Sequence, residues 1–399
     1  MAMTAIKRLS VTIAASLFSI LISTGESFAY TFTKIADSSG PFSFDGFFGN
    51  PAINDEGTVA FFASLDAGGE GIFIGSGGAT TTIADSNGPF SSFLFGFPAI
   101  NDEGTVAFFA FLDEGSSGIF TGSGGATTTI ADDNGPFLGG PFFGTDPAIN
   151  NEGTVAFQAE LDERLSSGIF TGSGGATTTI ADSSSPFSFF GNPTINDEGT
   201  VAFVASLDTG GGGVFTSSGG VTTTIADNSG PFNFFGTGGI NNGGTVAFQA
   251  VLDTGGVGIF TGSGGATTSI VDSSGLFSFF GGPAINDEGT VAFLANLNTG
   301  GEGIFTGSGS VTNKVIATGD TLFGSTVTQL FFYNEGLNNT GQLAFFARLA
   351  DGTSGIFRAD PESTSEPQTV PEPTSALGLL AVGLLGVGMW RKRQQLRTS

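Results

Sequence analysis

Apolar residues along this chain gather in short runs that recur every 45 to 52 residues. One run, Val59–Leu65, follows the polar stretch Asn54–Thr58, and the pair returns six more times in edited form. The shared pattern is N-x-x-G-x-[VL]-A-F-x-A-x-L. Repeats of this length are typical of propellers, solenoids and arrays, in which each unit is one supersecondary module.

The unit that begins at Pro51 shows what one repeat is expected to form. Pro51–Ile53 is predicted to be extended, and Asn54–Gly57 a turn, because Asn and Asp bond their own backbone and Gly accepts a positive φ. Thr58–Leu65 is apolar at nearly every position, which indicates a strand buried on both faces. Gly71–Ile74 is predicted to be the next strand.

The rest of the unit has a different character. Ala79–Asp85 alternates and is rich in Thr, as expected of a half-exposed edge strand. Ser86–Phe97 is rich in Pro, Gly and Phe and is interpreted as a crossing to the next unit. Each unit therefore has four strands joined by tight antiparallel turns, and no stretch of it has helical periodicity.

The two ends of the repeat array favour a ring. Tyr30–Asp37 corresponds to the fourth strand of a unit with nothing before it, whereas the last unit, Leu337–Arg358, supplies only three strands. If the N-terminal strand completes the last sheet, no sheet edge remains open to aggregation. We therefore predict an all-β fold: a seven-bladed β-propeller with four-stranded antiparallel blades in residues 30–360.

The amino-acid composition limits the catalytic and metal-binding chemistry that the chain can carry out. The chain has 44 Phe, 67 Gly, no Cys and no His, which excludes thiolate zinc sites and removes the commonest general base. All acidic residues except Glu26 and Glu372 lie within residues 30–370, with only five basic ones. Nucleic acid and anionic lipid are therefore not expected as partners. The recurring Phe is interpreted as packing between blades, with sugar stacking as the alternative.

The repeat turn supplies the first candidate residues, an Asn and a Gly in each copy. They are Asn54, Gly57, Asn101, Gly104, Asn150, Gly153, Asn196, Gly199, Asn241, Gly244, Asn286, Gly289, Asn338 and Gly341. Acidic residues accompany most copies, at Asp55, Glu56, Asp102, Glu103, Glu152, Asp197, Glu198, Asp287 and Glu288. Their oxygens could bind Ca²⁺, but the spacing matches neither the EF-hand loop nor the Gly-rich nonapeptide loop of β-roll calcium proteins. Solvated turns without a metal or other cofactor are the favoured interpretation.

Two further sets of carboxylates are candidates. The fourth strand of six units ends in Asp37, Asp85, Asp132, Asp182, Asp227 or Asp272, which is interpreted as an Asx-type strand exit. Residues that depart from the repeat are Asp45, Asp146, Glu160, Glu163, Arg164 and the segment Tyr333-Asn334-Glu335. Paired carboxylates of this kind can hydrolyse glycosides, but substitutions are tolerated easily in turns, so no catalytic residue is predicted.

The two ends of the chain carry targeting signals. Lys7 and Arg8, followed by an apolar stretch and Ser27-Phe28-Ala29, are typical of a signal peptide (residues 1–29) cleaved after Ala29. Residues 361–370 form a polar linker. Residues 371–399 then contain Pro371-Glu372-Pro373, an apolar run (375–390) and a basic cluster (391–393).

This tail resembles the PEP-CTERM sorting signal of exported bacterial proteins. The resemblance implies recognition by an exosortase, transient membrane anchoring through the C-terminal segment, and transfer to the cell surface or extracellular matrix. The repeat itself is similar to the NxxGxxAF tandem-repeat family of exported bacterial proteins, through Asn54, Gly57, Ala60, Phe61 and their counterparts. That likeness implies a location outside the cell and does not imply an activity.

The sequence thus predicts an exported structural or interaction module that is not an enzyme. Signal peptidase and exosortase are the expected processing partners, and extracellular polysaccharide or surface proteins are candidate ligands. Two alternatives stay open: a Ca²⁺-assisted carbohydrate-binding matrix protein, and a carboxylate-based glycan hydrolase or lyase.

Overall fold

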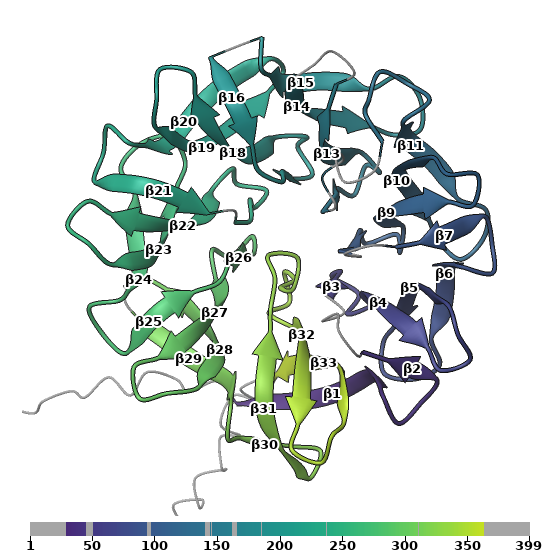
Figure 1. Cartoon of the computed structure of the whole chain (residues 1–399). Helices are drawn as coiled ribbons and strands as arrows, with labels where there is room; N and C mark the ends of the chain where they lie inside the picture. Colours follow the sequence, from purple (N-terminus) through teal and green to yellow (C-terminus); the bar gives the residue numbers. More distant parts are fainter. Residues whose placement is uncertain are drawn as a thin grey trace, which may run out of the picture.

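Seven antiparallel β-sheets surround one central axis in the computed structural model of the protein (Figure 1). The structure describes residues 29–44, 51–93, 97–139, 144, 146–161, 166–184, 186–236, 238–309 and 311–362. Every regular element within these ranges is a strand. The predicted seven-bladed propeller is therefore confirmed.

The strands of the first four blades follow in chain order. Blade 1 contains β2 (Phe42–Ser43), β3 (Ala52–Ile53), β4 (Val59–Leu65), β5 (Glu70–Gly75) and β6 (Thr81–Asp85). Blade 2 contains β7 (Phe90–Ser92), β8 (Ala99–Ile100), β9 (Val106–Leu112), β10 (Ser117–Gly122) and β11 (Thr128–Asp132). Blade 3 contains β12 (Ala148–Ile149), β13 (Val155–Glu160), β14 (Ser167–Gly172) and β15 (Thr178–Asp182). Blade 4 contains β16 (Phe187–Phe190), β17 (Thr194–Ile195), β18 (Val201–Leu207), β19 (Gly212–Ser218) and β20 (Val221–Asp227).

The remaining blades complete the ring. Blade 5 contains β21 (Phe232–Gly236), β22 (Val246–Leu252), β23 (Val257–Gly262) and β24 (Thr268–Asp272). Blade 6 contains β25 (Phe277–Phe280), β26 (Ala284–Ile285), β27 (Val291–Leu297), β28 (Glu302–Ser308) and β29 (Val311–Ala317). Blade 7 contains β30 (Thr321–Leu322), β31 (Ser325–Phe331), β32 (Leu343–Leu349) and β33 (Ser354–Pro361), together with β1 (Tyr30–Asp37) from the N-terminal end.

The first strand of a blade comes in two pieces, which corrects one prediction. In blade 2, β7 pairs with the end of β9 and β8 pairs with its start. The segment Ser86–Phe97, interpreted from sequence as an irregular crossing, therefore contains a strand. A bulge between Phe90 and Ser92 breaks the two-residue alternation, so the periodicity that would have indicated a strand is lost.

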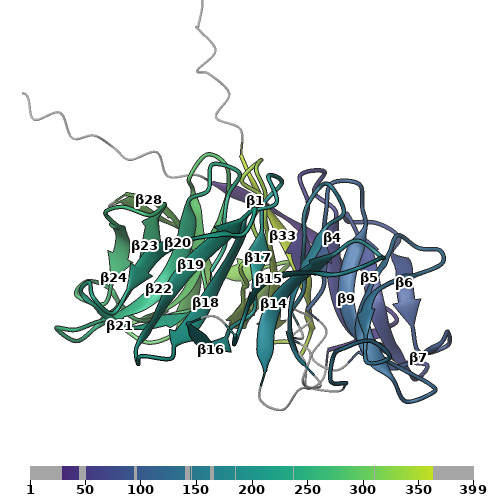
Figure 2. The same cartoon turned by 90° about the horizontal axis from the view of Figure 1, so that it is seen from above.

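The ring closes as predicted, with β1 as the outer strand of blade 7. Tyr30 lies opposite Pro361 and Asp37 opposite Gly355, and both views show β1 beside β33 (Figures 1 and 2). A guanidinium nitrogen (Nη1) of Arg358 in β33 donates to the Gly57 carbonyl of blade 1 at 2.6 Å. The seam between the two chain ends is thus held by a strand ladder and by a contact to the next blade.

The apolar core lies between blades. Among the described residues, the buried side chains form clusters at the junctions between neighbouring blades. Phe61 in β4 packs toward blade 7, whereas its neighbour Phe62 packs toward blade 2. This arrangement explains why the V-A-F strands are apolar at consecutive positions.

Phenylalanine triads fill these junctions. In blade 4 the Phe187 ring meets Phe203 and Phe215 edge-on, with centroid distances of 5.7 and 5.0 Å. Equivalent triads occur in blades 1, 2, 3, 5 and 6. Such pairs contribute about 0.5–1.5 kcal/mol beyond the area they bury, so packing is the role of these Phe residues.

Candidate functional site

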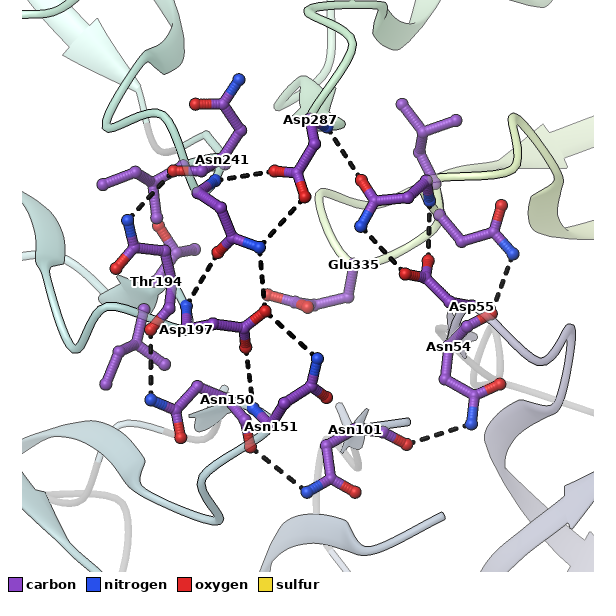
Figure 3. A pocket seen from close by; sticks show the side chains of 18 of the residues that line it. Asn54, Asp55, Asn101, Asn150, Asn151, Thr194, Asp197, Asn241, Asp287 and Glu335 are labelled. Atoms are coloured by element: carbon purple, nitrogen blue, oxygen red, sulfur yellow. Dashed lines mark hydrogen bonds between the residues drawn. The ribbon is translucent and has the colours of Figure 1, made fainter. Parts of the chain in front are cut away.

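The repeat turns meet around the axis of the propeller and line a cavity of about 140 Å³, which we call the axial cavity (Figure 3). The first ring of its wall is formed by the turn asparagines. Each donates from Nδ2 to the backbone carbonyl of the corresponding Asn in the next blade, at 2.8–3.3 Å, and Asn338 returns to Asn54. The seven bonds form a closed circle.

The same asparagines also hold their own turns. Asn54 Oδ1 accepts from the Thr58 N–H at 2.8 Å, and the other six blades repeat this bond. A carboxamide can donate and accept at once, whereas an ionised carboxylate only accepts. Asn is therefore required at this position, since Asp would leave the next blade's buried carbonyl without a donor.

The turn glycines are required by backbone conformation. Gly57, Gly104, Gly153, Gly199, Gly244, Gly289 and Gly341 all have φ between 73° and 78°, the left-handed region that costs other L-residues about 1–2 kcal/mol. Each donates its N–H to the carbonyl of the turn Asn, for example Gly199 to Asn196 at 3.0 Å. The structure thus places every predicted Asn and Gly in the turn.

A second ring lies one residue further along the turns. Each backbone N–H donates to the side-chain Oδ1 of the corresponding residue in the next blade, at 2.7–2.9 Å. The ring consists, in order, of Asp55, Asp102, Asn151, Asp197, Asn242, Asp287 and Asn339. The carboxylates at this position are therefore structural acceptors.

Asn and Asp nearly alternate in this second ring. Asn242 Nδ2 bridges Asp197 and Asp287 at 2.8 and 3.0 Å, and Asn151 bridges the carboxylates on both of its sides in the same way. Because the ring has an odd number of positions, Asn and Asp cannot alternate all the way round. Asp55 and Asp102 are therefore neighbours, with no carboxamide between them. The Glu residues that follow in the turns are exposed (Glu56, Glu103, Glu152, Glu198, Glu288).

Blade 7 has a carboxyl group three residues before its turn asparagine, a position at which no other blade has one. Three residues before the turn asparagine, the other blades carry Pro51, Pro98, Pro147, Pro193, Gly238 and Pro283, and blade 7 carries Glu335. In blade 7 this residue lies in a tight turn, in which the Gly336 N–H donates to the Tyr333 carbonyl at 3.0 Å. Glu335 points from this turn into the axial cavity (Figure 3).

Glu335 also lines a second cavity of about 30 Å³, the proline cavity, whose wall includes Pro51, Pro98, Pro147 and Pro193. Asp146 from blade 3 reaches the same cavity and accepts from Asn192 Nδ2 at 2.7 Å. The Tyr333 ring meets Phe97 edge-on at 5.0 Å. The departures from the repeat at Asp146 and Tyr333–Glu335 are thus brought together, and Phe97 and Asn192 join them unpredicted.

The electrostatics of this group are unusual. Desolvation, and next the negative charge of Asp146, raise the pKa of Glu335 from 4.5 to about 7. Desolvation likewise raises the pKa of the Tyr333 phenol, with a smaller contribution from Asp146. Glu335 is half-buried and keeps part of its surface toward the cavity. A carboxyl group with such a pKa is a candidate functional group.

The other sequence candidates that the structure describes do not line the axial cavity. Asp37, Asp85, Asp132, Asp182, Asp227 and Asp272 each accept from the backbone N–H two residues later, as predicted for Asx-type strand exits. Hydrogen bonds from Ser274 lower the pKa of Asp272. Glu160 lies in β13 opposite Ser167. Asp45, Glu163 and Arg164 lie outside the described residues.

One set of phenylalanines does not pack as predicted. Phe189, Phe234 and Phe279 occupy the same register position in blades 4, 5 and 6 and are 64%, 63% and 52% exposed. Blade 2 has Ser92 and blade 7 has Gln329 at this position. A bulge precedes each of these residues, which turns the side chain out of the blade junction. We call these three residues the phenylalanine row.

Two kinds of feature are absent from the part of the chain that is described. No group of three or more Asp or Glu is positioned there to hold a metal ion. No helix in the same part is long and apolar enough to cross a membrane. The predicted tail residues Pro371, Glu372 and Pro373 lie outside it, while Ala29 is its first residue, and its carbonyl accepts from the Glu362 N–H at 2.8 Å.

These features define a class: a closed seven-bladed β-propeller whose repeat turns wall an axial cavity. The chain belongs to a protein family of unknown function, DUF7453, whose family model matches residues 25–377. The likeness to the NxxGxxAF family stays a resemblance of the motif. No curated protein matches the chain in sequence at a significant level.

A second family model, the PEP-CTERM protein-sorting motif, matches residues 369–394. This match confirms the predicted sorting signal. It indicates an exported protein that is sorted through its C-terminal segment, with an exosortase as the processing partner. The signal peptide stays a prediction.

Solved structures share the fold at low identity. The β-propeller domain of the Trilobed protease from Pyrococcus furiosus, described as having an open velcro topology, is 13% identical over 68% of this chain and 84% of that chain, with a TM-score of 0.50. An oligogalacturonate lyase in complex with manganese is 9% identical over 84% and 98%, with a TM-score of 0.52.

Prolyl oligopeptidase B from Galerina marginata is 12% identical over 77% of this chain, with a TM-score of 0.50, and the chain spans about half of its length (47%). At these identities the likeness concerns the fold alone. The ring of this chain differs from the open topology named for the Trilobed protease, because β1 pairs with β33.

Proposed function

We propose that this protein is an interaction module, exported and sorted to the cell surface or extracellular matrix, that acts by binding rather than by catalysis. The phenylalanine row carries the proposal. Large exposed apolar side chains scattered singly are ordinary on protein surfaces, but these three recur at one position in three consecutive blades. Exposed apolar side chains gathered on one surface are a feature of binding sites.

The recurrence of the row once in each of three consecutive blades suits a ligand with repeated apolar faces. Equivalent positions in neighbouring blades lie on the same face of the propeller, and Figure 1 shows β16, β21 and β25 following one another around the ring. A linear polysaccharide presents an apolar sugar face at regular intervals, on which phenyl rings can stack. Extracellular polysaccharide is therefore the ligand class we assign to this surface.

The residues and cavities around the axis favour binding over catalysis. The repeat carboxylates are acceptors in the second ring, where they hold one blade to the next. The axial and proline cavities, at about 140 and 30 Å³, are smaller than the roughly 300–1,000 Å³ of ordinary small-molecule sites. A glycan hydrolase or lyase that uses Glu335 and Asp146 would need room for a sugar between them, so it is the less supported alternative.

The test compares polysaccharide binding of the wild type and a triple variant. Phe189→Ser, Phe234→Ser and Phe279→Ser introduce the residue that blade 2 carries naturally at this position, which preserves the fold. We expect at least a tenfold loss of affinity on a glycan array and in titration of the best glycan. The matched control is Val221→Ser with Val311→Ser, which removes exposed apolar side chains from outer hairpins and should change the affinity less than twofold.

Equal binding by wild type and triple variant would reject the phenylalanine row as the ligand surface. Repeating the array with Ca²⁺ and with a chelator tests the second interpretation, Ca²⁺-assisted carbohydrate binding. That interpretation requires glycan binding to disappear in the chelator. Protease treatment of intact cells, with and without the exosortase, tests surface sorting: the chain should be cleaved from outside only when it has been sorted.

A further inference from the structure

The phenylalanine row ends at an open groove between blades 6 and 7, which we call the junction groove. Its volume is about 560 Å³, and its wall includes Asn296 of blade 6 and Gln329 of blade 7. Asn296 lies opposite Phe279, the last residue of the row, and Gln329 occupies the row position in blade 7. The groove therefore continues the row, with polar side chains in place of phenyl rings.

Hydrogen bonds within the protein shape the wall of the junction groove. Glu302, at the start of β28, accepts from the Leu330 N–H of β31 through Oε1 at 2.7 Å, and these two strands lie side by side (Figure 1). Thr318 Oγ1 accepts from the Glu302 N–H at 3.1 Å and donates to the Glu302 carbonyl at 3.3 Å. Thr328 Oγ1 donates to the Arg348 carbonyl at 3.0 Å. Because these bonds join both blades, the groove is formed before a ligand binds.

Two carboxamides in the wall are available to a ligand. Asn296 is exposed and Gln329 is half-buried, and neither side chain hydrogen-bonds another residue that the structure describes. A carboxamide offers two donors and an acceptor in one plane, and Arg348, which lines the same groove, has a planar guanidinium with five donors. Planar groups that donate and accept side by side match the neighbouring hydroxyl groups of a sugar ring.

The charges of the groove and of the whole chain favour an uncharged ligand. Among the lining residues, Arg348 is cationic and Glu302 is anionic, so the wall has no net charge. The chain as a whole has a formal net charge of −25, which repels polymers of the same sign. The groove is also large enough for a sugar unit, since its volume lies within the roughly 300–1,000 Å³ of ordinary small-molecule sites.

We propose that the junction groove is the polar end of the polysaccharide surface, where the hydroxyl groups of one uncharged sugar unit hydrogen-bond the carboxamides of Asn296 and Gln329. The neighbouring units of the same glycan chain stack on the phenylalanine row. This subsite presupposes the polysaccharide binding proposed above, and it adds a second kind of contact and a ligand class, a neutral polysaccharide.

The junction of blades 1 and 2 shows that the fold does not require these carboxamides. The positions of Asn296 and Gln329 are occupied there by Ser64 and Ser92. Glu70, the counterpart of the acid at the junction groove, still accepts a backbone N–H of blade 2 at 2.7 Å. Serine at both positions is therefore compatible with the contact between blades and supplies the test variant.

The experiment is titration of the full-length protein with the neutral polysaccharide that the wild type binds best on the glycan array. Asn296→Ser combined with Gln329→Ser should bind at least fivefold more weakly. The matched control, Asn87→Ser with Asn134→Ser, makes the same two changes in exposed turns outside the groove and should change the affinity less than twofold. A roughly tenfold increase in salt concentration should also leave the wild-type affinity within twofold, because a neutral ligand has no charge to screen.

The outcomes separate this subsite from the phenylalanine row. Equal binding by the double serine variant and the wild type would overturn the junction groove as a subsite, and the row would stand if its own triple variant still lost affinity. Preferential binding of polyuronates, weakened by salt, would overturn the neutral ligand class. Loss of binding in the double variant but not in the triple variant would reject the row and retain the groove. A wild type that binds no glycan on the array would reject both.

Discussion

The first six blades and the seventh place different residues at the same level of the axis. Three positions before the turn asparagine, five of the six have proline and blade 5 has Gly238, whereas blade 7 presents Glu335 from a tight turn. Blade 7 is also the only blade built from both ends of the chain. The repeated blades show what the fold requires, and the exceptional blade shows what the protein has added to it.

The largest effect is expected from removing the strand that makes blade 7 exceptional. Deletion of Tyr30–Asp37 exposes the edge of β33 and the half-filled cluster around Phe345, so the folded state should be lost. Circular dichroism and thermal melting measure this. Because Tyr30 lies opposite Pro361, a permutant that begins at Ser38 and joins Pro361 to Tyr30 through Asn-Gly should fold.

A deletion variant that melts like the wild type would contradict ring closure by β1. Removal of residues 363–399 is the control, since they follow the last described residue and are not part of any blade that the structure describes. It should leave the melting temperature within about 2 °C of the wild type.

The second effect separates Glu335 from the prolines it replaces. Its folded pKa of about 7 exceeds its ordinary value of 4.5, so between these pH values the folded protein holds a proton that the unfolded chain releases. The contribution of this group to stability is full below pH 4.5, declines as the pH rises, and is lost above pH 7. At pH 8 the free energy of unfolding of Glu335→Gln should therefore exceed that of the wild type by up to about 3 kcal/mol.

Urea unfolding at pH 4.5, 6 and 8 measures this difference. Glu335→Gln and the wild type should approach each other at the lowest pH. Parallel stability curves for the two proteins would show that Glu335 ionises freely in the folded state. Glu198→Gln, on the exposed part of the same type of turn, should follow the wild type.

The third effect tests the asparagine ring in an ordinary blade and in blade 7. Asn196→Ala removes the bond to the Asn241 carbonyl and the bond from the Thr200 N–H, and should cost about 2 kcal/mol in unfolding free energy. Asn338→Ala additionally removes bonds to Gln342 Oε1 and from Thr340, so it should cost more. The reverse order in urea unfolding would show that these additional bonds do not stabilise the seam.

The smallest effect concerns the turn backbone alone. Gly199 has a φ of 73°, and no atom lies within 4 Å of the position that a Cβ would occupy, so Gly199→Ala introduces conformational strain and no clash. We expect a loss of about 1 kcal/mol in unfolding free energy. Gly175→Ala is the control, because this outer-hairpin glycine is equally open and its φ is not positive. Equal stabilities of the two variants would remove the conformational argument for the turn glycines.

Much of the fold was predictable because its signals are local. The turn needs Asn and a Gly three positions later, and the strand after it needs apolar side chains on both faces; both requirements are visible within one repeat. The unpaired strand at Tyr30–Asp37 was enough to predict closure. The prediction failed at β7, because a bulge hides the alternation on which strand recognition depends.

The candidate site was predictable only in part. Comparing repeats singled out Asp146 and Tyr333–Glu335 as departures, but Asp146 and Glu335 come from blades 3 and 7 and are 189 positions apart in the chain. Their shared cavity exists only when the ring is closed. Phe97 and Asn192 gave no signal, since single substitutions before a proline look like ordinary loop variation.

The sequence by itself thus determined the blade, the number of blades, the closing strand and the turn chemistry, since each depends on residues near one another or on a pattern that repeats. Only the tertiary structure decided that each turn Asn also bonds the next blade, that the repeat carboxylates serve as acceptors in a second ring, and that Phe189, Phe234 and Phe279 face solvent. It alone brought Glu335 and Asp146 to one cavity. The two rings depend on contacts between residues 45 or more positions apart, whereas the exposed phenylalanines follow from bulges between paired strands of one blade.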